Sequence, residues 1–377
     1  MPYDMVIQGG SVVDPSQGLS KELDLAITDG RIVAVEEYLP TADAKNVIDA
    51  AGLLVVPGLV DLHVHVFSGV AELAIDADPS CVERGTTTVV DAGSAGSNTI
   101  DTFVRHTADE SATRILAFLN ISGMGQLDLE IGELEDLRWA RVDRAVDAGR
   151  RHAEVLVGIK VRLSAEIAGP NAVAGLDRSI EAAEQLGLPV MIHIGNTDQE
   201  LGAFLDKLRT GDIVTHAFTG RPPGILDVGG KVIEEAIDAR ARGVLFDVGH
   251  GAGSFSFAIA EQAAEHGFFP DTISSDLHRL NVEGPVFDLA TTLSKYLFLG
   301  HSLEEVIAMA TTRPAAAIGW EDRLGTLGVG SEADIALLRM EEGPVTLVDA
   351  LGEERTGRVM LRPEATVRAG IVFRPSS

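Results

Sequence analysis

The chain has 377 residues, of which 45% are hydrophobic, and a formal net charge of −27 at pH 7. This length and apolar content predict a globular protein with one large core or two domains, and they exclude a disordered chain. The acidic charge argues against nucleic acids and anionic membranes as partners, because both would be repelled by the protein surface.

Three further features bear on location. No stretch of about eighteen residues is both apolar and uncharged, so we expect no membrane span. The first residues carry neither the basic nor the apolar segment of a signal peptide. The single cysteine, Cys81, excludes an internal disulfide framework, so we expect a protein of the reducing cytoplasm. The sequence leaves homo-oligomerisation open.

Both ends of the chain are predicted to form β-strands. Residues 3–15 and 24–37 alternate apolar and polar side chains around Gly-Gly and Asp-Gly turns, as hairpins do. The same pattern returns in residues 333–375. We expect residues 1–56 and 326–377 to pair into one small β-sandwich domain that is discontinuous in sequence.

The middle of the chain alternates short apolar runs with amphipathic stretches, which is typical of repeated βα units. Eight apolar runs lie at residues 58–67, 86–93, 114–122, 155–164, 188–195, 212–218, 244–251 and 271–278. Helical periodicity between them lies at 97–110, 137–152, 176–187 and 230–243. The pattern predicts an α/β fold, a (β/α)8 TIM barrel, over residues 57–325. An open doubly wound sheet is the alternative, but no G-x-G-x-x-G motif follows the first run.

Metal-binding side chains lie near the ends of four predicted strands, where barrel enzymes place their active sites. His63 and His65 are two residues apart and share one face of the first strand. His193, His216 and Asp276 follow on the fifth, sixth and eighth strands. Imidazole and carboxylate groups suit zinc and similar divalent ions. A single strand histidine is more often a hydrogen-bonded core residue, but the whole set favours a metal centre. The remaining histidines on predicted helices or helix ends, expected to be solvated, are His106, His152, His266 and His301.

Lys160 interrupts the apolar run at residues 155–164. An unpaired ammonium in a buried strand is costly, so either the side chain reaches outward to solvent or the amine is modified. Burial beside two metal ions would lower the pKa of the amine and leave it neutral. A neutral amine reacts with carbon dioxide to form a carbamate, which is an anionic ligand able to bridge two metals. We therefore interpret Lys160 as an N6-carboxylysine.

The whole pattern resembles the amidohydrolase superfamily in its binuclear, carboxylated-lysine type. The resemblance covers nearly the whole chain and rests on VPGLVDLHVH (56–65), ADIALL (333–338) and the β-rich ends. Finer features are similar to the amidohydrolase/deacetylase branch, often labelled dihydroorotase-like: GIKVRLS, HAFTGRPPGI, FDVGHGAGSFSF and ISSDLH. The resemblance implies a metal-dependent hydrolase with two divalent ions, and zinc is the ion we expect.

The resemblance also implies a role for each residue of the set. His63, His65 and Asp276 would hold the more buried metal, His193 and His216 would hold the more exposed one, and Lys160 and a hydroxide would bridge them. The hydroxide would attack a substrate carbonyl, and Asp276 would accept its proton and pass it to the leaving group.

Arg162 and His278 are predicted to face the same site. Arg162 lies two residues after Lys160 on one strand face. Either an internal carboxylate neutralises its charge, or it binds the carboxylate of a small-molecule substrate. We predict the second, a substrate carboxylate bound by Arg162. His278 is two residues after Asp276 and either orients substrate or makes a structural hydrogen bond.

Two loops supply further candidates. The GHGAGS segment at 249–254 allows a close approach of the backbone to a ligand, and its His250 is a candidate for substrate contact. Arg221 lies on the loop after His216, where we expect a mobile and solvated side chain.

Three functions are compatible with these residues. The first is a hydrolase that releases an acyl group from a small acylated hydroxy or amino acid. The second is a cyclic amidase of the dihydroorotase or hydantoinase kind, although the arginine typical of dihydroorotases is missing from HVHVFSG (63–69). The third is a non-catalytic metal-binding scaffold, which the complete ligand set disfavours. Cys81 precedes the second strand, and we expect it to pack in the core rather than to bind metal as the cysteine of D-aminoacylases does.

Overall fold

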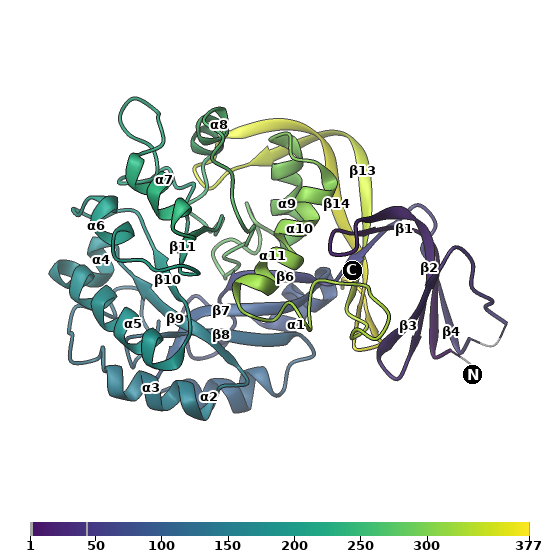
Figure 1. The fold of residues 1–377 in the computed structure, drawn as a ribbon, viewed down its shortest axis with the longest axis horizontal. Helices are drawn as coiled ribbons and strands as arrows, with labels where there is room; N and C mark the ends of the chain where they lie inside the picture. Colours follow the sequence, from purple (N-terminus) through teal and green to yellow (C-terminus); the bar gives the residue numbers. More distant parts are fainter. Residues whose placement is uncertain (1–2, 43, 377) are drawn as a thin grey trace.

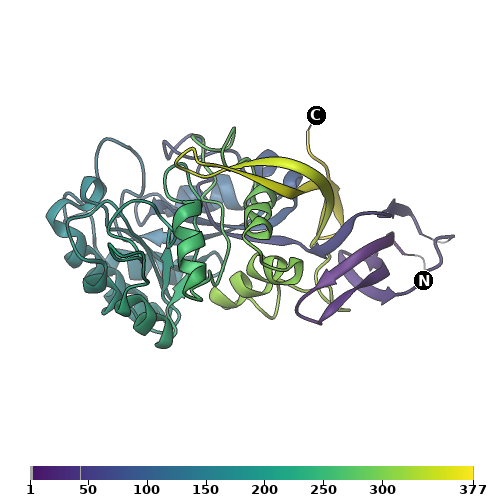
Figure 2. The same cartoon turned by 90° about the horizontal axis from the view of Figure 1, so that it is seen from above.

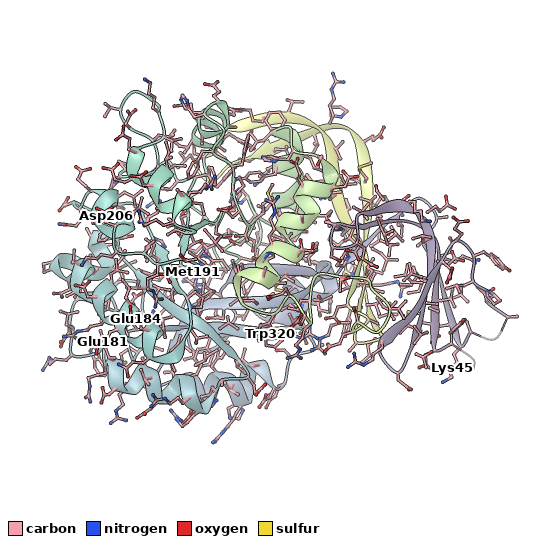
Figure 3. All side chains as sticks on the ribbon, viewed as in Figure 1. Lys45, Glu181, Glu184, Met191, Asp206 and Trp320 are labelled. Atoms are coloured by element: carbon pink, nitrogen blue, oxygen red, sulfur yellow. The ribbon has the colours of Figure 1, made fainter. Side chains whose placement is uncertain are left out.

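The computed structural model describes residues 3–42 and 44–376. A parallel sheet with surrounding helices forms one part of the molecule, and a mixed sheet built from both ends of the chain forms the other (Figure 1). Charged side chains such as Lys45, Glu181 and Asp206 lie at the surface, whereas Met191 lies in the interior (Figure 3).

The parallel sheet has seven strands in the order β12-β11-β10-β9-β8-β7-β6. Its strands are β6 (Leu59–Val64), β7 (Thr86–Gly96), β8 (Arg114–Asn120), β9 (Leu156–Arg162), β10 (Val190–His193), β11 (Ile213–Thr215) and β12 (Leu245–Phe246). Each strand falls within or overlaps one of the predicted apolar runs. The runs are almost wholly apolar because helices and the barrel core cover both faces of the sheet.

The eighth predicted run closes this sheet without forming a regular strand. Thr272 bridges in parallel to Asp247, just after β12, and Leu277 bridges in parallel to Val64 of β6. Asp276, between them, has a φ of 49°, which an extended strand does not allow. The predicted TIM-type barrel is therefore confirmed, with an irregular eighth member.

Helices cover the outside of the barrel. They are α1 (Ala77–Ser80), α2 (Ile100–Phe103), α3 (Val142–Arg151), α4 (Ala165–Ala168), α5 (Ala172–Leu186), α6 (Leu201–Leu205), α7 (Glu234–Ala241), α8 (Phe257–Glu265), α9 (Leu289–Phe298), α10 (Leu303–Met309) and α11 (Thr312–Ala317). The four helical stretches expected from periodicity contain or overlap α2, α3, α5 and α7. Within residues 3–42 and 44–376, no helix has the length and apolar character needed to cross a membrane.

The chain ends form one eight-stranded mixed sheet. Its N-terminal strands lie at one end of the molecule, and the C-terminal hairpin runs from there toward the barrel (Figure 2). Its strands are β1 (Met5–Asp14), β2 (Leu19–Thr28), β3 (Arg31–Glu36), β4 (Asn46–Asp49), β5 (Leu54–Pro57), β13 (Ile335–Val348), β14 (Glu354–Arg368) and β15 (Ile371–Phe373). β5 joins the two ends, because it pairs with β1 on one side and with β13 on the other. Apolar residues of β1, β2, β13 and β14 share one core. The predicted pairing of the two chain ends is thus confirmed, as one mixed hydrogen-bonded sheet.

The long β13–β14 hairpin also reaches over the barrel (Figure 1). The Leu361 N–H donates to Ser294 Oγ of α9 at 2.8 Å, and the Phe257 N–H of α8 donates to Asp349 Oδ2 at 3.0 Å. The Ala350 N–H donates to the Phe255 carbonyl at 3.0 Å. The hairpin therefore supports the loop after β12, which borders the site described next. The division into domains at residues 57 and 326 stays a prediction.

Candidate active site

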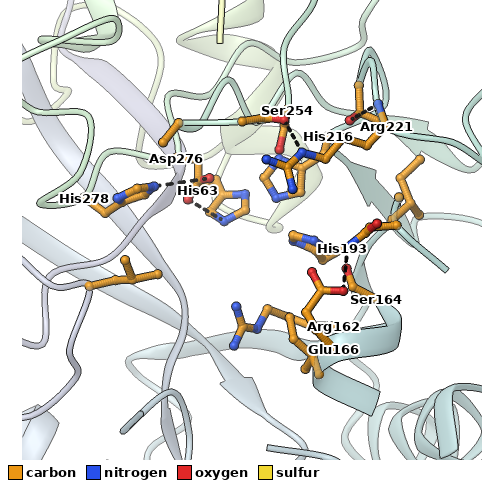
Figure 4. Close-up of a pocket in the computed structure, with 18 of the residues that line it drawn as sticks. His63, Arg162, Ser164, Glu166, His193, His216, Arg221, Ser254, Asp276 and His278 are labelled. Atoms are coloured by element: carbon orange, nitrogen blue, oxygen red, sulfur yellow. Dashed lines mark hydrogen bonds and ion pairs between the residues drawn. The ribbon is translucent and has the colours of Figure 1, made fainter. Parts of the chain in front are cut away.

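Side chains at the carboxyl ends of β6, β9, β10 and β11 line one cavity, as in other barrels of this type. The cavity has a volume of about 220 Å³. Its walls include His63, His65, Arg162, His193, His216, Arg221, Asp276 and His278 (Figure 4). The structure therefore brings together residues that are as far as 215 positions apart in the chain (278 − 63).

Three of these side chains form a compact group of metal-binding atoms. One ligand atom each from His63, His216 and Asp276 lies within 4.8 Å of the other two, and all three residues are buried. Nε2 of His63 and Nε2 of His65 lie 3.3 and 3.2 Å from Asp276 Oδ1. The ring of His193 packs edge-on against that of His216, with 4.3 Å between centroids. The five predicted ligands other than Lys160 thus converge.

The hydrogen bonds behind His63 determine which ring nitrogen carries the proton. Thr215 Oγ1 donates its only hydrogen to Asp247 Oδ2 at 2.7 Å, so it must accept from His63 Nδ1 at 2.9 Å. Burial lowers the pKa of His63 well below its ordinary value, so the ring is neutral and Nε2 is a bare acceptor. Two acceptors facing each other at 3.3 Å repel unless a cation lies with them. The donor set therefore fits a metal ion.

His216 shows the same arrangement. Its Nδ1 contacts the Gly249 carbonyl oxygen at 2.6 Å, and a carbonyl can only accept, so Nε2 of His216 is again free of a proton. Burial lowers the pKa of His216 to about 4 and that of His65 to about 4. At neutral pH a metal ion would therefore not compete with protons for these rings.

Lys160 is fully buried on β9. Among the described residues its amine has one hydrogen-bond partner, the Met191 Sδ at 3.4 Å, which is a weak acceptor. Burial lowers the pKa of the Lys160 amine to about 7. The charge of Lys160 adds to burial in lowering the pKa of His63 and of His193. The alternative of an outward, solvated Lys160 is therefore wrong.

The backbone at the site has unusual geometry. His216 and Asp276 have φ angles of 62° and 49°, in the left-handed region where non-glycine residues cost roughly 1 kcal/mol or more and cluster at functional sites. A Cβ on Gly251 would lie 2.5 Å from Asp276 Oδ2. The glycine-rich segment thus lets the backbone approach the Asp276 side chain closely.

Arg162 has an internal partner. Its Nε and Nη2 donate to the two carboxylate oxygens of Glu133, each at 2.6 Å. The Glu133 side chain is 2% exposed. The internal ion pair is therefore present, and it supplies the anion that the predicted substrate carboxylate was meant to supply. A substrate carboxylate is not needed to explain a buried guanidinium here.

The two remaining histidine candidates differ. The Leu280 N–H donates to His278 Nδ1 at 3.2 Å, so His278 Nε2 carries the proton, and it faces Asp276 Oδ2 at 4.0 Å. His250 does not line the cavity, which contradicts its predicted substrate contact. Its Nε2 lies 2.6 Å from the Lys295 amine, and its Nδ1 contacts the Gly251 carbonyl at 2.9 Å.

Sequence reasoning missed several residues behind the ligands. Asp247 accepts hydrogen bonds from the hydroxyl groups of Thr215, Thr272 and Ser274. Asp91 accepts from the Ser94 N–H. The Ser94 Oγ in turn contacts His65 Nδ1. A carboxylate inside an apolar run, the signal that singled out Lys160, could have found Asp247 and Asp91. Glu133 lies in the loop between β8 and α3, where no such signal exists. Cys81 is buried in the hydrophobic core, as predicted.

We predict that Thr215→Val weakens metal binding by about 10- to 100-fold, as removal of an outer hydrogen-bond partner of a ligand does. The variant keeps the side-chain shape but leaves His63 Nδ1 without its partner. A competitive titration against a chromogenic chelator measures the affinity. Thr292→Val is the matched control, because Thr292 is buried and its Oγ1 has no hydrogen-bond partner among the described residues. Equal affinities for both variants would contradict this role of Thr215.

We predict that Arg162→Met destabilises the protein by about 3 kcal/mol or more, because it leaves the Glu133 carboxylate buried and unpaired. The double variant Arg162→Met/Glu133→Leu should recover much of that loss, since no isolated charge remains. Urea unfolding of both single variants and the double variant gives the coupling energy. Additive losses would show that the ion pair is not an energetic unit.

Comparison with known proteins agrees with this site. The family model described as "Amidohydrolase family" matches residues 54–355. A deacetylase of Agrobacterium fabrum is 34% identical over 340 residues, which cover 90% of this chain and 83% of the relative. A deacetylase of Enterococcus faecalis is 32% identical over 376 residues, covering 99% and 100% of the two chains.

A solved structure of similar shape carries a different name. The crystal structure of an adenine deaminase superimposes with a TM-score of 0.92 at 32% identity and covers 99% of this chain and all of that one. The family model spans well over half of the sequence, and the relatives align over most of it. The chain therefore belongs to the amidohydrolase family and is a hydrolase.

Proposed function

We propose that this hydrolase is a metal-dependent deacetylase that removes an acyl group from a small acylated hydroxy or amino acid. The observation that carries the proposal is the convergence of proton-free ring nitrogens of His63 and His216 on the Asp276 carboxylate in a cavity. A volume of about 220 Å³ suits a small molecule. The names of the two deacetylase relatives favour an acyl group as the part that is released.

We propose that the ligand set holds two divalent ions, which we expect to be zinc. His63, His65 and Asp276 would hold one ion, and His193 and His216 would hold the other. Bound divalent ions supply Lewis acidity, which polarises a carbonyl oxygen and lowers the pKa of water. The buried Lys160 amine would attack carbon dioxide at carbon and lose a proton, and the resulting carbamate would be a ligand for both ions.

The chain's own residues would move and hold the proton. Asp276 has one oxygen beside His63 and His65 and the other toward His278. We infer that Asp276 accepts the proton of the attacking water and delivers it to the leaving group. The protonated Nε2 of His278 would keep the Asp276 carboxylate in one orientation.

The other two functions have less support. A cyclic amidase would need a group that binds a ring substrate, and no arginine follows the H-x-H pair in HVHVFSG. A non-catalytic scaffold would not need Asp276 or the strained backbone that presents it. A cytoplasmic location and homo-oligomerisation remain predictions.

We predict that zinc-loaded protein hydrolyses one or more members of a panel of N-acetyl amino acids and O-acetyl hydroxy acids of both hands. Asp276→Asn should retain much of the metal and lose turnover by about 10²-fold or more, since it removes the proton acceptor. His106→Asn is the control, because His106 is an exposed histidine outside the cavity. Acetate release and elemental analysis of the same samples are the measurements.

The outcomes separate the three functions. Hydrolysis of dihydroorotate, hydantoins or adenine in place of the acetylated acids would overturn the deacetylase proposal. Metal binding without hydrolysis of any member would favour the scaffold. Turnover of Asp276→Asn equal to that of His106→Asn would remove Asp276 from the proton transfer.

We predict a carbamate signal in the carbon-13 spectrum of protein prepared with labelled bicarbonate, and its loss in Lys160→Ala. Lys295→Met should retain the signal. Lys295 is a second buried lysine, but its amine already contacts His250 Nε2 at 2.6 Å and donates to the Pro285 carbonyl at 3.0 Å. A signal that survives in Lys160→Ala and disappears in Lys295→Met would assign the carbamate to Lys295 and contradict the proposal.

A further inference from the structure

Two arginines line the cavity, and their surroundings differ. Arg162 forms a two-point ion pair with Glu133. The charge of Glu166, another residue of the cavity wall, also acts on Arg162. The positive charge of Arg162 is therefore already balanced inside the protein.

Arg221 has no carboxylate partner of this kind among the described residues. Its Nε donates to the Gly253 carbonyl at 2.8 Å, and no carboxylate among the described residues lies within ion-pair distance of its guanidinium. The side chain is exposed at the cavity wall, beside the loop that holds Ser254 (Figure 4). One edge of the guanidinium is thus held by backbone, and its positive charge is free for a ligand.

The loop that carries Arg221 is held on both sides. The Asn196 N–H, after β10, donates to the Pro222 carbonyl at 2.9 Å, and the Gly220 N–H donates to the Ser254 carbonyl at 3.1 Å. The Arg221 N–H donates to Thr219 Oγ1 at 3.1 Å. Arg221 is therefore positioned before a ligand arrives, which reduces the entropy lost on binding.

Gly253 makes room for the guanidinium. A Cβ at this position would overlap Arg221 Nη2. The φ of Gly253 is not in the left-handed region, so its backbone does not require glycine. An alanine at this position would therefore displace the end of the Arg221 side chain.

We propose that Arg221, rather than Arg162, binds the carboxylate of the substrate, and that the substrate is an anion for this reason. The proposal rests on the proposed deacetylase function and names the group that selects its substrates. The net charge of −27 repels anions from the molecule as a whole, so an anionic substrate needs a local cation. A guanidinium offers a carboxylate two parallel N–H donors, which a lone ammonium does not.

The test compares each acid with its neutral amide. The probes are N-acetylalanine and O-acetyllactate of both hands, with N-acetylalaninamide and O-acetyllactamide. We expect wild type to prefer the acids. Arg221→Met should lower kcat/KM for the acid by about 10- to 100-fold, the effect of losing hydrogen bonds to a charged group, with most of the change in KM. The amide should change by less than about 3-fold, because it makes no ion pair.

Three variants sharpen the comparison. Gly253→Ala displaces the guanidinium without removing its charge and should reduce the preference for the acid partway. Arg162→Met should lower the rates for acid and amide alike and retain their ratio. Arg105→Met removes an exposed arginine that does not line the cavity and should match wild type.

Calorimetric titration with the same acids separates this inference from the proposed function. If wild type hydrolyses no acetylated compound but binds the acids, and Arg221→Met does not bind them, Arg221 is an anion site in an enzyme of another activity. If the enzyme deacetylates and Arg221→Met keeps the wild-type acid-to-amide ratio, the inference fails and the function stands. The inference about Arg221 is also overturned if wild type hydrolyses and binds the acid and the amide equally well.

Discussion

The centre of this structure is a set of buried acceptors that face one another without protons between them. The bare Nε2 atoms of His63 and His216 and the carboxylate of Asp276 repel each other in the absence of a cation. The barrel holds them together nevertheless, because each ring is fixed from behind by Thr215 or by the Gly249 carbonyl. A divalent ion that binds between these acceptors would remove their mutual repulsion, and this relief would add to the affinity for the ion.

A layer of buried carboxylates behind the ligands also closes the barrel. Asp61 of β6 accepts from the N–H and the hydroxyl of Ser275, and Asp247 accepts from Thr272 and Ser274. Burial disfavours the charged carboxylate of Asp61 and raises its pKa to about 7. Side-chain hydrogen bonds thus replace the regular ladder that the 272–277 segment lacks. Closure of the barrel and placement of the metal ligands depend on the same contacts.

The sequence was sufficient for the barrel and for the ligand set, because strand periodicity and chain order determine both. Alternation places His63 and His65 on one face, and parallel strands bring their carboxyl ends to one edge. It could not show the irregular eighth member, because the backbone around Asp276 bonds to His63 of β6 and to the loop after β12. It also misplaced His250, since a residue at a strand end can turn toward the barrel wall, where Lys295 meets it.

For Arg162 and Arg221, the sequence pattern did not predict the partners that the structure shows. Alternation correctly put Arg162 on the inner face of β9, but a face does not specify a partner, and Glu133 approaches from a loop 29 positions away. For Arg221 the sequence predicts only a mobile, solvated side chain, because its loop has no periodic pattern. Its position depends on hydrogen bonds to the segments after β10 and β12, which only the folded chain brings together. In a barrel of this kind the strands therefore specify the reaction that is available, and the packing of loops against one another specifies which charge the site can accept.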